Sequence, residues 1–190
     1  MPERLKRFAA IAFTIGLLSS ITLLPAAAME KTVNVGGAAM YPSKNIIQNA
    51  VNSQDHTTLV AAVKAAGLVD TLQGAGPFTV FAPTNEAFKK LPAGTVENLV
   101  KPENKPTLTK ILTYHVVPGR LSARDLAEMV DKAGGKAVLK TVEGDDLTVM
   151  RTGNHHLKLT DDKGDVATIT IADVFQSNGV IHVVNSVMLP

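Results

Sequence analysis

The chain contains no cysteine and no tryptophan, and aromatic residues make up only 4% of its 190 residues. Without cysteine it forms no disulfide, has no cysteine nucleophile and carries no lipid on a thiol. Binders of glycans and of single-stranded nucleic acids use aromatic rings as stacking platforms, so the scarcity of rings argues against both classes. A Gly-x-Ser-x-Gly segment between a strand and a helix is also missing, which removes the usual hydrolase nucleophile.

Residues 1–28 have the pattern of a secretory signal peptide. A basic start at Arg4, Lys6 and Arg7 precedes a mainly apolar run, and small residues at 26–28 suit cleavage. Polar and small residues interrupt the run, which favours cleavage over a retained membrane anchor. We therefore expect export to the periplasm or the extracellular space, with a mature chain that begins at Met29 and has no membrane span.

Removal of this segment makes the chain neutral. It takes three basic and one acidic side chain from totals of 19 and 17, which leaves 16 of each. A neutral, mixed surface argues against nucleic acid or anionic lipid as a partner, because both require a basic patch. The remaining 162 of 190 residues suit a single domain with a full core.

Residues 76–88 indicate a buried strand that turns sharply into a helix. Phe78 and Phe81 lie in a short apolar run with β-branched neighbours, and Pro83 ends it because proline has no N–H to donate. Thr84 is placed to cap the helix, and Phe88 begins its apolar face. This stretch joins a sheet to a helical layer.

Helical signals fill the first half of the chain. Residues 29–40 show no periodicity and are interpreted as a flexible leader, so the folded domain starts near Tyr41. Asp55 is predicted to cap a helix that ends at Gly67. Ser122 and Asp125 have the spacing of a capping box for a later helix.

Period-two alternation fills the second half and predicts strands separated by hairpin turns such as Asn178-Gly179. Helices first and strands last predict an α+β fold rather than alternating α/β. The expected strands are 136–142, 147–151, 156–160, 166–171, 180–184 and 187–189.

Three segments resemble, in the correct order, the signatures of the fasciclin domain family. They are residues 78–88 (FTVFAPTNEAF), 114–119 (YHVVPG), and 178–184 (NGVIHVV) followed by 187–190 (VMLP). The resemblance covers about residues 41–190. It implies a compact twisted β-sandwich with a helical layer packed against one edge.

Cofactor and metal sites are not predicted. Gly74 and Gly76 have the spacing of a nucleotide loop, but a strand follows them where phosphate binding needs a helix N-terminus. His155 and His156 would point to opposite faces of a strand, so they cannot chelate one ion together. Residues 161–165 lack the alternating ligands of a calcium loop and favour a tight turn.

Two short segments are the candidate partner-binding sites. In some adhesive fasciclin proteins a Tyr-His segment, and an Asp before a branched residue, are receptor-binding motifs. The resemblance therefore implies recognition by Tyr114 and His115 and by Asp173 and Val174. The residues themselves favour structure, because a histidine in so apolar a run is usually buried and hydrogen-bonded. His182 has the same interpretation, and we expect Tyr114 to be the exposed anchor of its pair.

The resemblance implies a non-enzymatic, exported module for cell adhesion, with a cell-surface or matrix protein as its partner. The alternative is a carrier for a small apolar ligand such as a carotenoid or a lipid, held in a groove lined by aliphatic side chains.

Overall fold

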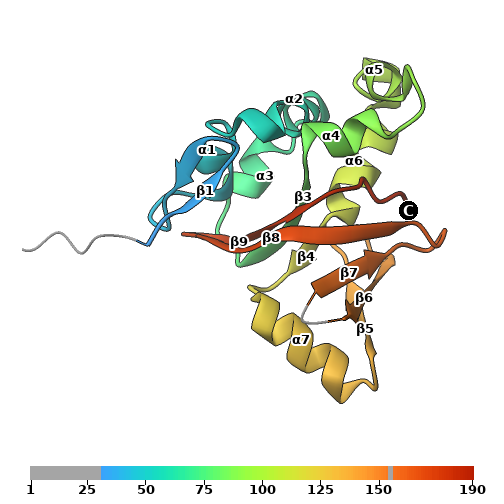
Figure 1. The fold of residues 1–190 in the computed structure, drawn as a ribbon. Coiled ribbons are helices and arrows are strands. Elements are labelled where there is room, and N and C mark those ends of the chain that lie inside the picture. Colours follow the sequence, from blue (N-terminus) through green and yellow to red (C-terminus); the bar gives the residue numbers. More distant parts are fainter. Residues whose placement is uncertain (1–30, 154–155) are drawn as a thin grey trace, which may run out of the picture.

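The computed structural model describes residues 31–153 and 156–190 (Figure 1). The expected signal peptide and His155 lie outside the described residues. The helices are α1 (Ile46–Ala50), η1 (Gln54–His56), α2 (Thr57–Ala66), α3 (Val69–Gln73), α4 (Asn85–Lys89), α5 (Thr95–Leu99), η2 (Pro102–Asn104), α6 (Lys105–Tyr114) and α7 (Ala123–Lys132). The strands are β1 (Val33–Val35), β2 (Ala38–Met40), β3 (Phe78–Pro83), β4 (Val116–Pro118), β5 (Lys136–Lys140), β6 (Asp146–Thr152), β7 (His156–Thr160), β8 (Val166–Gln176) and β9 (Gly179–Val184).

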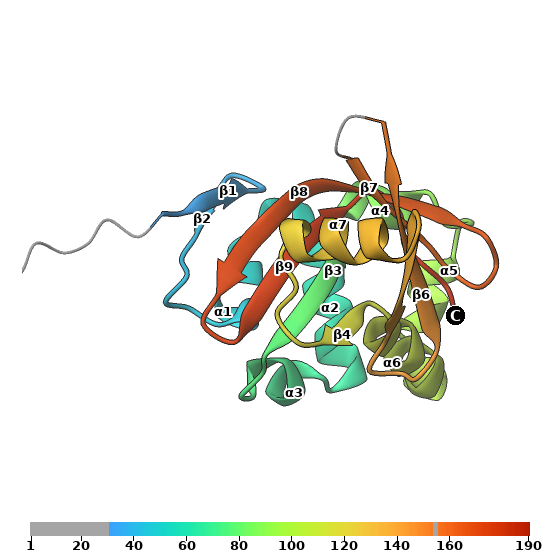
Figure 2. The ribbon, with the colours of Figure 1, turned by 90° about the horizontal axis from the view of Figure 1, so that it is seen from below.

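The predicted α+β fold is confirmed. Seven strands form one sheet in the order β4-β3-β9-β8-β7-β6-β5, and only the pairing of β3 with β9 is parallel. The Val142 N–H donates to the Val116 carbonyl at 2.7 Å, which brings the two ends of the sheet together. Helices α1 to α6 lie on one side of β3, β9 and β8, and α7 lies on the other (Figures 1 and 2).

The stretch from β3 into α4 has the predicted structure. Phe81 is fully buried, Pro83 is the last residue of β3, and the Thr84 N–H donates to the Val184 carbonyl at 3.3 Å. The Thr84 hydroxyl then accepts from the Ala87 N–H at 3.2 Å and caps α4. Phe88 follows in the core, so one short segment leaves the sheet and immediately enters the helical layer.

Two hydrophobic cores pack on opposite sides of the sheet. The helix-side core joins α1, α2 and α6 to Val80 and Ile181. The α7-side core joins Leu126 and Val130 of α7 to Phe81 and to inward-facing residues of β5 to β8. Alternate residues of β3 and β9 serve one core and then the other, as expected for a strand covered on both faces.

The flexible leader predicted over 29–40 is wrong for residues 33–40, which form the β1–β2 hairpin. Gly36 and Gly37 both have positive φ, which suits a two-residue hairpin turn. Val35 and Met40 are each 3% exposed and belong to the helix-side core. Each strand has only three residues, too few for a recognisable period in the sequence.

Two other local predictions fail because distant side chains replace local partners. Asp55 does not cap α2; the Asn85 side chain accepts from the Thr58 N–H at 3.0 Å instead. Residues 187–189 are not a strand, because their N–H groups bond to side chains. Met188 donates to His115 Nε2 at 3.1 Å, and Leu189 donates to Asp161 Oδ2 at 3.0 Å.

The β3–α4 stretch gives a first prediction. Phe81→Ala should lower the free energy of unfolding by about 3 to 5 kcal/mol, through lost burial and the cavity left behind. Thr84→Ala removes one cap and should cost only about 1 kcal/mol. Urea unfolding of both variants measures the difference. Equal, small losses would show that Phe81 contributes little to the core.

Candidate functional site

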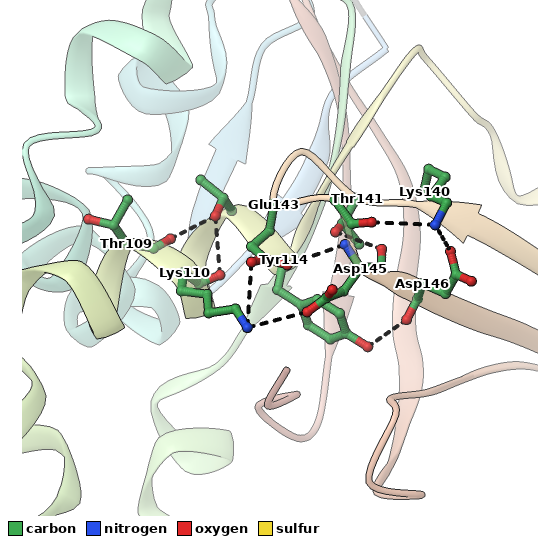
Figure 3. Close-up of polar contacts among 10 residues, drawn as sticks. Thr109, Lys110, Tyr114, Lys140, Thr141, Glu143, Asp145 and Asp146 are labelled. Carbon is green, nitrogen blue, oxygen red and sulfur yellow. Dashed lines mark hydrogen bonds and ion pairs between the residues drawn. The ribbon is translucent and has the colours of Figure 1, made fainter.

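Tyr114 is buried, contrary to the exposed anchor expected from the sequence. It is the last residue of α6, its side chain is 0% exposed, and it belongs to the α7-side core. Its hydroxyl donates to the Asp146 carbonyl at 2.8 Å (Figure 3). Burial raises the pKa of Tyr114 to about 12, and the charges of Asp162 and Asp161 add to the shift. The ring therefore links α6 to the sheet and offers no surface to a partner.

Charged side chains gather around the turn between β5 and β6, near the Tyr114 hydroxyl. Lys110 of α6 lies 3.5 Å from Glu143 and 3.4 Å from Asp145, and Lys140 lies 2.7 Å from Asp146 (Figure 3). Hydrogen bonding to Asp145 is the main cause that raises the pKa of Lys110. These lysines are exposed, so the ion pairs contribute little to stability.

His115 has the predicted structural role. It is 3% exposed, Met188 donates to its Nε2, and its Nδ1 lies 2.8 Å from the Ile111 carbonyl. Because a backbone N–H can only donate, Nε2 is the acceptor and Nδ1 carries the proton. The neutral ring therefore bonds on both sides, joining the end of α6 to the C-terminal segment.

His182 and Asp173 hold the start of α7 against the sheet. The Asp173 N–H donates to His182 Nδ1 at 3.3 Å, so the proton lies on Nε2, which donates to the Leu121 carbonyl at 2.8 Å. Asp173 has a φ of 58°, and its carboxylate accepts from the Ala123 N–H at 2.7 Å. Val174 is 1% exposed. The pair proposed for recognition therefore consists of a helix-capping aspartate and a core valine.

Asn178 and Gly179 organise the turn from β8 to β9. The Asn178 side chain accepts from the Ile46 N–H at 3.0 Å and donates to the carbonyls of Leu72 and Gly74. A Cβ atom on Gly179 would collide with the carbonyl of Phe78, its partner in the parallel pair. The third signature therefore connects α1, the end of α3 and β3.

Two buried polar residues, Asn49 and Asp161, make long-range hydrogen bonds that the sequence does not predict. Asn49 is 0% exposed, exchanges two hydrogen bonds with the Tyr41 backbone, and also bonds to Gln176 of β8. The Asp161 carboxylate accepts from its own turn and from Leu189. An asparagine or aspartate in a loop predicts only a turn, so no local signal reveals these long-range partners.

A small apolar cavity of about 50 Å³ lies within the helix-side core. Its walls include Val35 and Met40 of the hairpin, Val63 of α2 and Ala82 of β3. His56 also lines it, and its Nε2 has no hydrogen-bond partner. Burial lowers the pKa of His56, an effect that the nearby Ala82 carbonyl only partly offsets. This volume holds no more than a few water molecules, which need at least about 10 to 15 Å³ each.

Within ranges 31–153 and 156–190, no three histidine, aspartate or glutamate side chains are placed to hold a metal ion. The same ranges contain no helix long and apolar enough to cross a membrane. Fold and site therefore define a class: a packed α+β module whose signature residues build its core.

Comparison with known proteins identifies the family within that class. The fasciclin domain matches residues 54–190, and the chain belongs to the fasciclin domain family. Protein sll1483 of Synechocystis is 44% identical over 180 residues, which cover 94% of this chain and 91% of that protein. Cell surface glycolipoprotein MPB83 of Mycobacterium bovis is 33% identical over 162 residues, covering 83% and 64%.

A solved structure shows the same fold. The FAS1 domain pair of the insect cell adhesion molecule fasciclin I superposes with a TM-score of 0.69 at 16% identity, over 85% of this chain and 59% of that one. The β1–β2 hairpin and α1 precede residues 54–190, the range over which the family matches.

Acid should destabilise the protein through His115. Burial lowers its pKa from 6.5 to about 4, with the Ile111 carbonyl and Asp161 opposing the shift. Since the unfolded chain binds the proton more readily, this contribution to stability is complete above about pH 6.5 and is lost as the pH falls through 4. We expect a loss of roughly 3 kcal/mol, because one pKa unit corresponds to about 1.4 kcal/mol.

Urea unfolding of wild type and His115→Ala across this pH range measures the effect. At pH 7 the variant should lose about 1 to 3 kcal/mol, because the Met188 N–H is left without its acceptor. Its pH profile should be flatter than that of wild type. Burial also lowers the pKa of His182, so the difference between the two profiles isolates His115. His156→Ala alters an exposed histidine and should keep the wild-type profile; a wild-type profile in His115→Ala would contradict the assignment.

Proposed function

We propose that this chain is an exported, non-enzymatic fasciclin module that mediates attachment at the cell surface or in the extracellular matrix. The observation that carries the proposal is the similarity over 83% of the chain to a relative named as a cell-surface glycolipoprotein. The secretory pattern of residues 1–28 supports the same location. The shared fold with an insect cell adhesion molecule agrees with this function but shows the fold alone.

The contacts of the signature residues support recognition at another surface of the domain. Tyr114, His115, Val174 and His182 are all buried, and the Asp173 carboxylate is bonded to the start of α7. Their side chains hold the two cores together, which supports attachment through a surface formed by other residues. This differs from the receptor-binding role that the resemblance implied for the Tyr-His and Asp-Val segments.

Deletion of the gene should reduce attachment of the host cells to surfaces or to one another. Expression of the full chain should restore attachment, whereas a chain that lacks residues 1–28 should not, because it stays inside the cell. Tyr114→Phe should restore attachment fully, because it removes only a buried hydroxyl at a cost of about 0.5 to 1.5 kcal/mol. Counting attached cells at matched protein levels provides the measurement. Normal attachment of the deletion strain would reject the proposed function.

The carrier alternative is favoured by one observation, the apolar cavity behind the β1–β2 hairpin. A volume of about 50 Å³ is far below that of a carotenoid site, since ligand pockets are typically about 300 to 1,000 Å³. A carotenoid or lipid could enter only after the hairpin, with Val35 and Met40, moved away.

Solvent extraction of the protein purified from its own host tests the carrier function. We expect no stoichiometric pigment or lipid in the extract, because a cavity of about 50 Å³ is too small for molecules of that size. Stoichiometric ligand would establish the carrier. Replacement of hairpin residues 33–40 by a flexible Gly-Ser segment should then change ligand retention, while a Gly-Ser replacement of residues 101–104, which lie away from the cavity, should leave it unchanged.

A further inference from the structure

The outward-facing residues of β5, β6, β7 and the first half of β8 form an uncovered surface, here called the outer sheet face. The inward-facing residues of these strands pack against α7 in the α7-side core. One outward row runs across all four strands through the register Val138, Thr148, Thr160 and Val166. Val138 is 57% exposed and Val166 is 47% exposed, so no described element covers the ends of this row.

The next row of the outer sheet face carries a positive charge. Its register is Lys136, Met150, Lys158 and Thr168. The two lysines are two strands apart, which corresponds to about 10 Å across a sheet. Neither has an ion pair among the contacts of the described residues. The row therefore presents two free ammonium groups on either side of a methionine.

Acidic side chains near this face either form an ion pair with a lysine or lie beyond one end of its strands. Asp146 is an outward residue of β6, and Lys140 pairs with it at 2.7 Å. Asp162 and Asp165 belong to the β7–β8 turn, beyond the end of the row that contains Thr160. The chain without its signal peptide is neutral as a whole, but the fold separates its charges and leaves the row of Lys136 and Lys158 basic.

Hydroxyl groups surround the two lysines. Thr148 and Thr160 lie in the neighbouring row and Thr168 in the same row. The Thr160 Oγ1 is shielded from water, so a ligand on this face does not reach it. A threonine hydroxyl both donates and accepts, as sugar hydroxyls do. The face thus combines cations with hydroxyls, so it suits a glycan held by charge and hydrogen bonds rather than by the ring stacking that the scarcity of aromatic residues argues against.

We propose that the outer sheet face binds an acidic polysaccharide, with carboxylate or sulfate groups on Lys136 and Lys158 and sugar hydroxyls on Thr148 and Thr168. This inference rests on the proposed function and names the partner class of that attachment. A protein partner fits less well, because protein interfaces concentrate their energy in Trp, Tyr and Arg anchors and these rows contain none. Single-stranded nucleic acid fits less well too, because its bases would have no Phe, Tyr or Trp ring to stack on.

Binding of the exported chain to three polymers tests the inference. Alginate supplies carboxylates, dextran sulfate supplies sulfates, and neutral dextran supplies neither. At low salt we expect binding to at least one acidic polymer, no binding to dextran, and weaker binding as salt rises. The polymer that binds identifies the anion.

A matched pair of double variants locates the binding surface. Lys136→Gln with Lys158→Gln should weaken binding roughly fivefold or more and reduce its salt dependence, because two charge contacts are lost. Lys64→Gln with Lys101→Gln removes the same charge from two exposed positions away from this face, one in α2 and one just before η2, and should bind like wild type. Thermal unfolding of both double variants should match wild type, because surface substitutions change stability by no more than about 0.5 kcal/mol.

Equal weakening by both double variants, or equal binding of dextran and the acidic polymers, would overturn the inference. Another result would also overturn it: a wild-type chain that binds none of the three polymers and forms a dimer. If Lys136→Gln with Lys158→Gln dissociates that dimer, the face is a contact between two copies of the chain. If Lys136→Gln with Lys158→Gln loses polymer binding but restores normal cell attachment, the outer sheet face does not mediate attachment. Normal attachment of a deletion strain would instead contradict the proposed function. Polymer binding by the purified chain is a separate measurement and does not depend on that result.

Discussion

The parallel pairing of β3 with β9 supports most of the structure. It joins residues about a hundred positions apart, from Phe78 opposite Gly179 to Pro83 opposite Val184. Every residue of β9 is buried, because both faces of this strand contact a core. The absence of a side chain at Gly179 lets the two backbones approach, and Asn178 bonds the adjoining turn to the helical layer. The helix-side and α7-side cores therefore share one central pair of strands.

Two neutral histidines extend this pairing to the rest of the chain. His115 connects the end of α6 to the C-terminal segment, and His182 connects β9 to the start of α7. Each ring donates through one nitrogen and accepts through the other, so a proton would remove a bond as well as place a charge in the core. A histidine suits these positions because its two ring nitrogens bond to two buried backbone groups, and those groups are far apart in the sequence.

The use of signature residues for packing has a consequence for function. Residues that build the core can be shared by proteins that bind different partners, because the fold leaves its outer surfaces free to vary. In this chain those surfaces include the outer sheet face, with Lys136 and Lys158, and the β1–β2 hairpin. The interaction that we propose depends on the side chains that the sheet turns outward, while the shared fold supplies the rigid support beneath them.

The sequence by itself determined the α+β class, the family, and local features whose causes lie within a few residues. These include β3 and its turn into α4, the Thr84 cap and the Ser122–Asp125 capping box. Only the tertiary structure decided that Tyr114 is buried and that Asp173 caps α7. A side chain that bonds to a residue tens of positions away leaves no periodic pattern, and its burial depends on which element covers it. The charged row of the outer sheet face likewise exists only because the strand register brings Lys136 and Lys158 together.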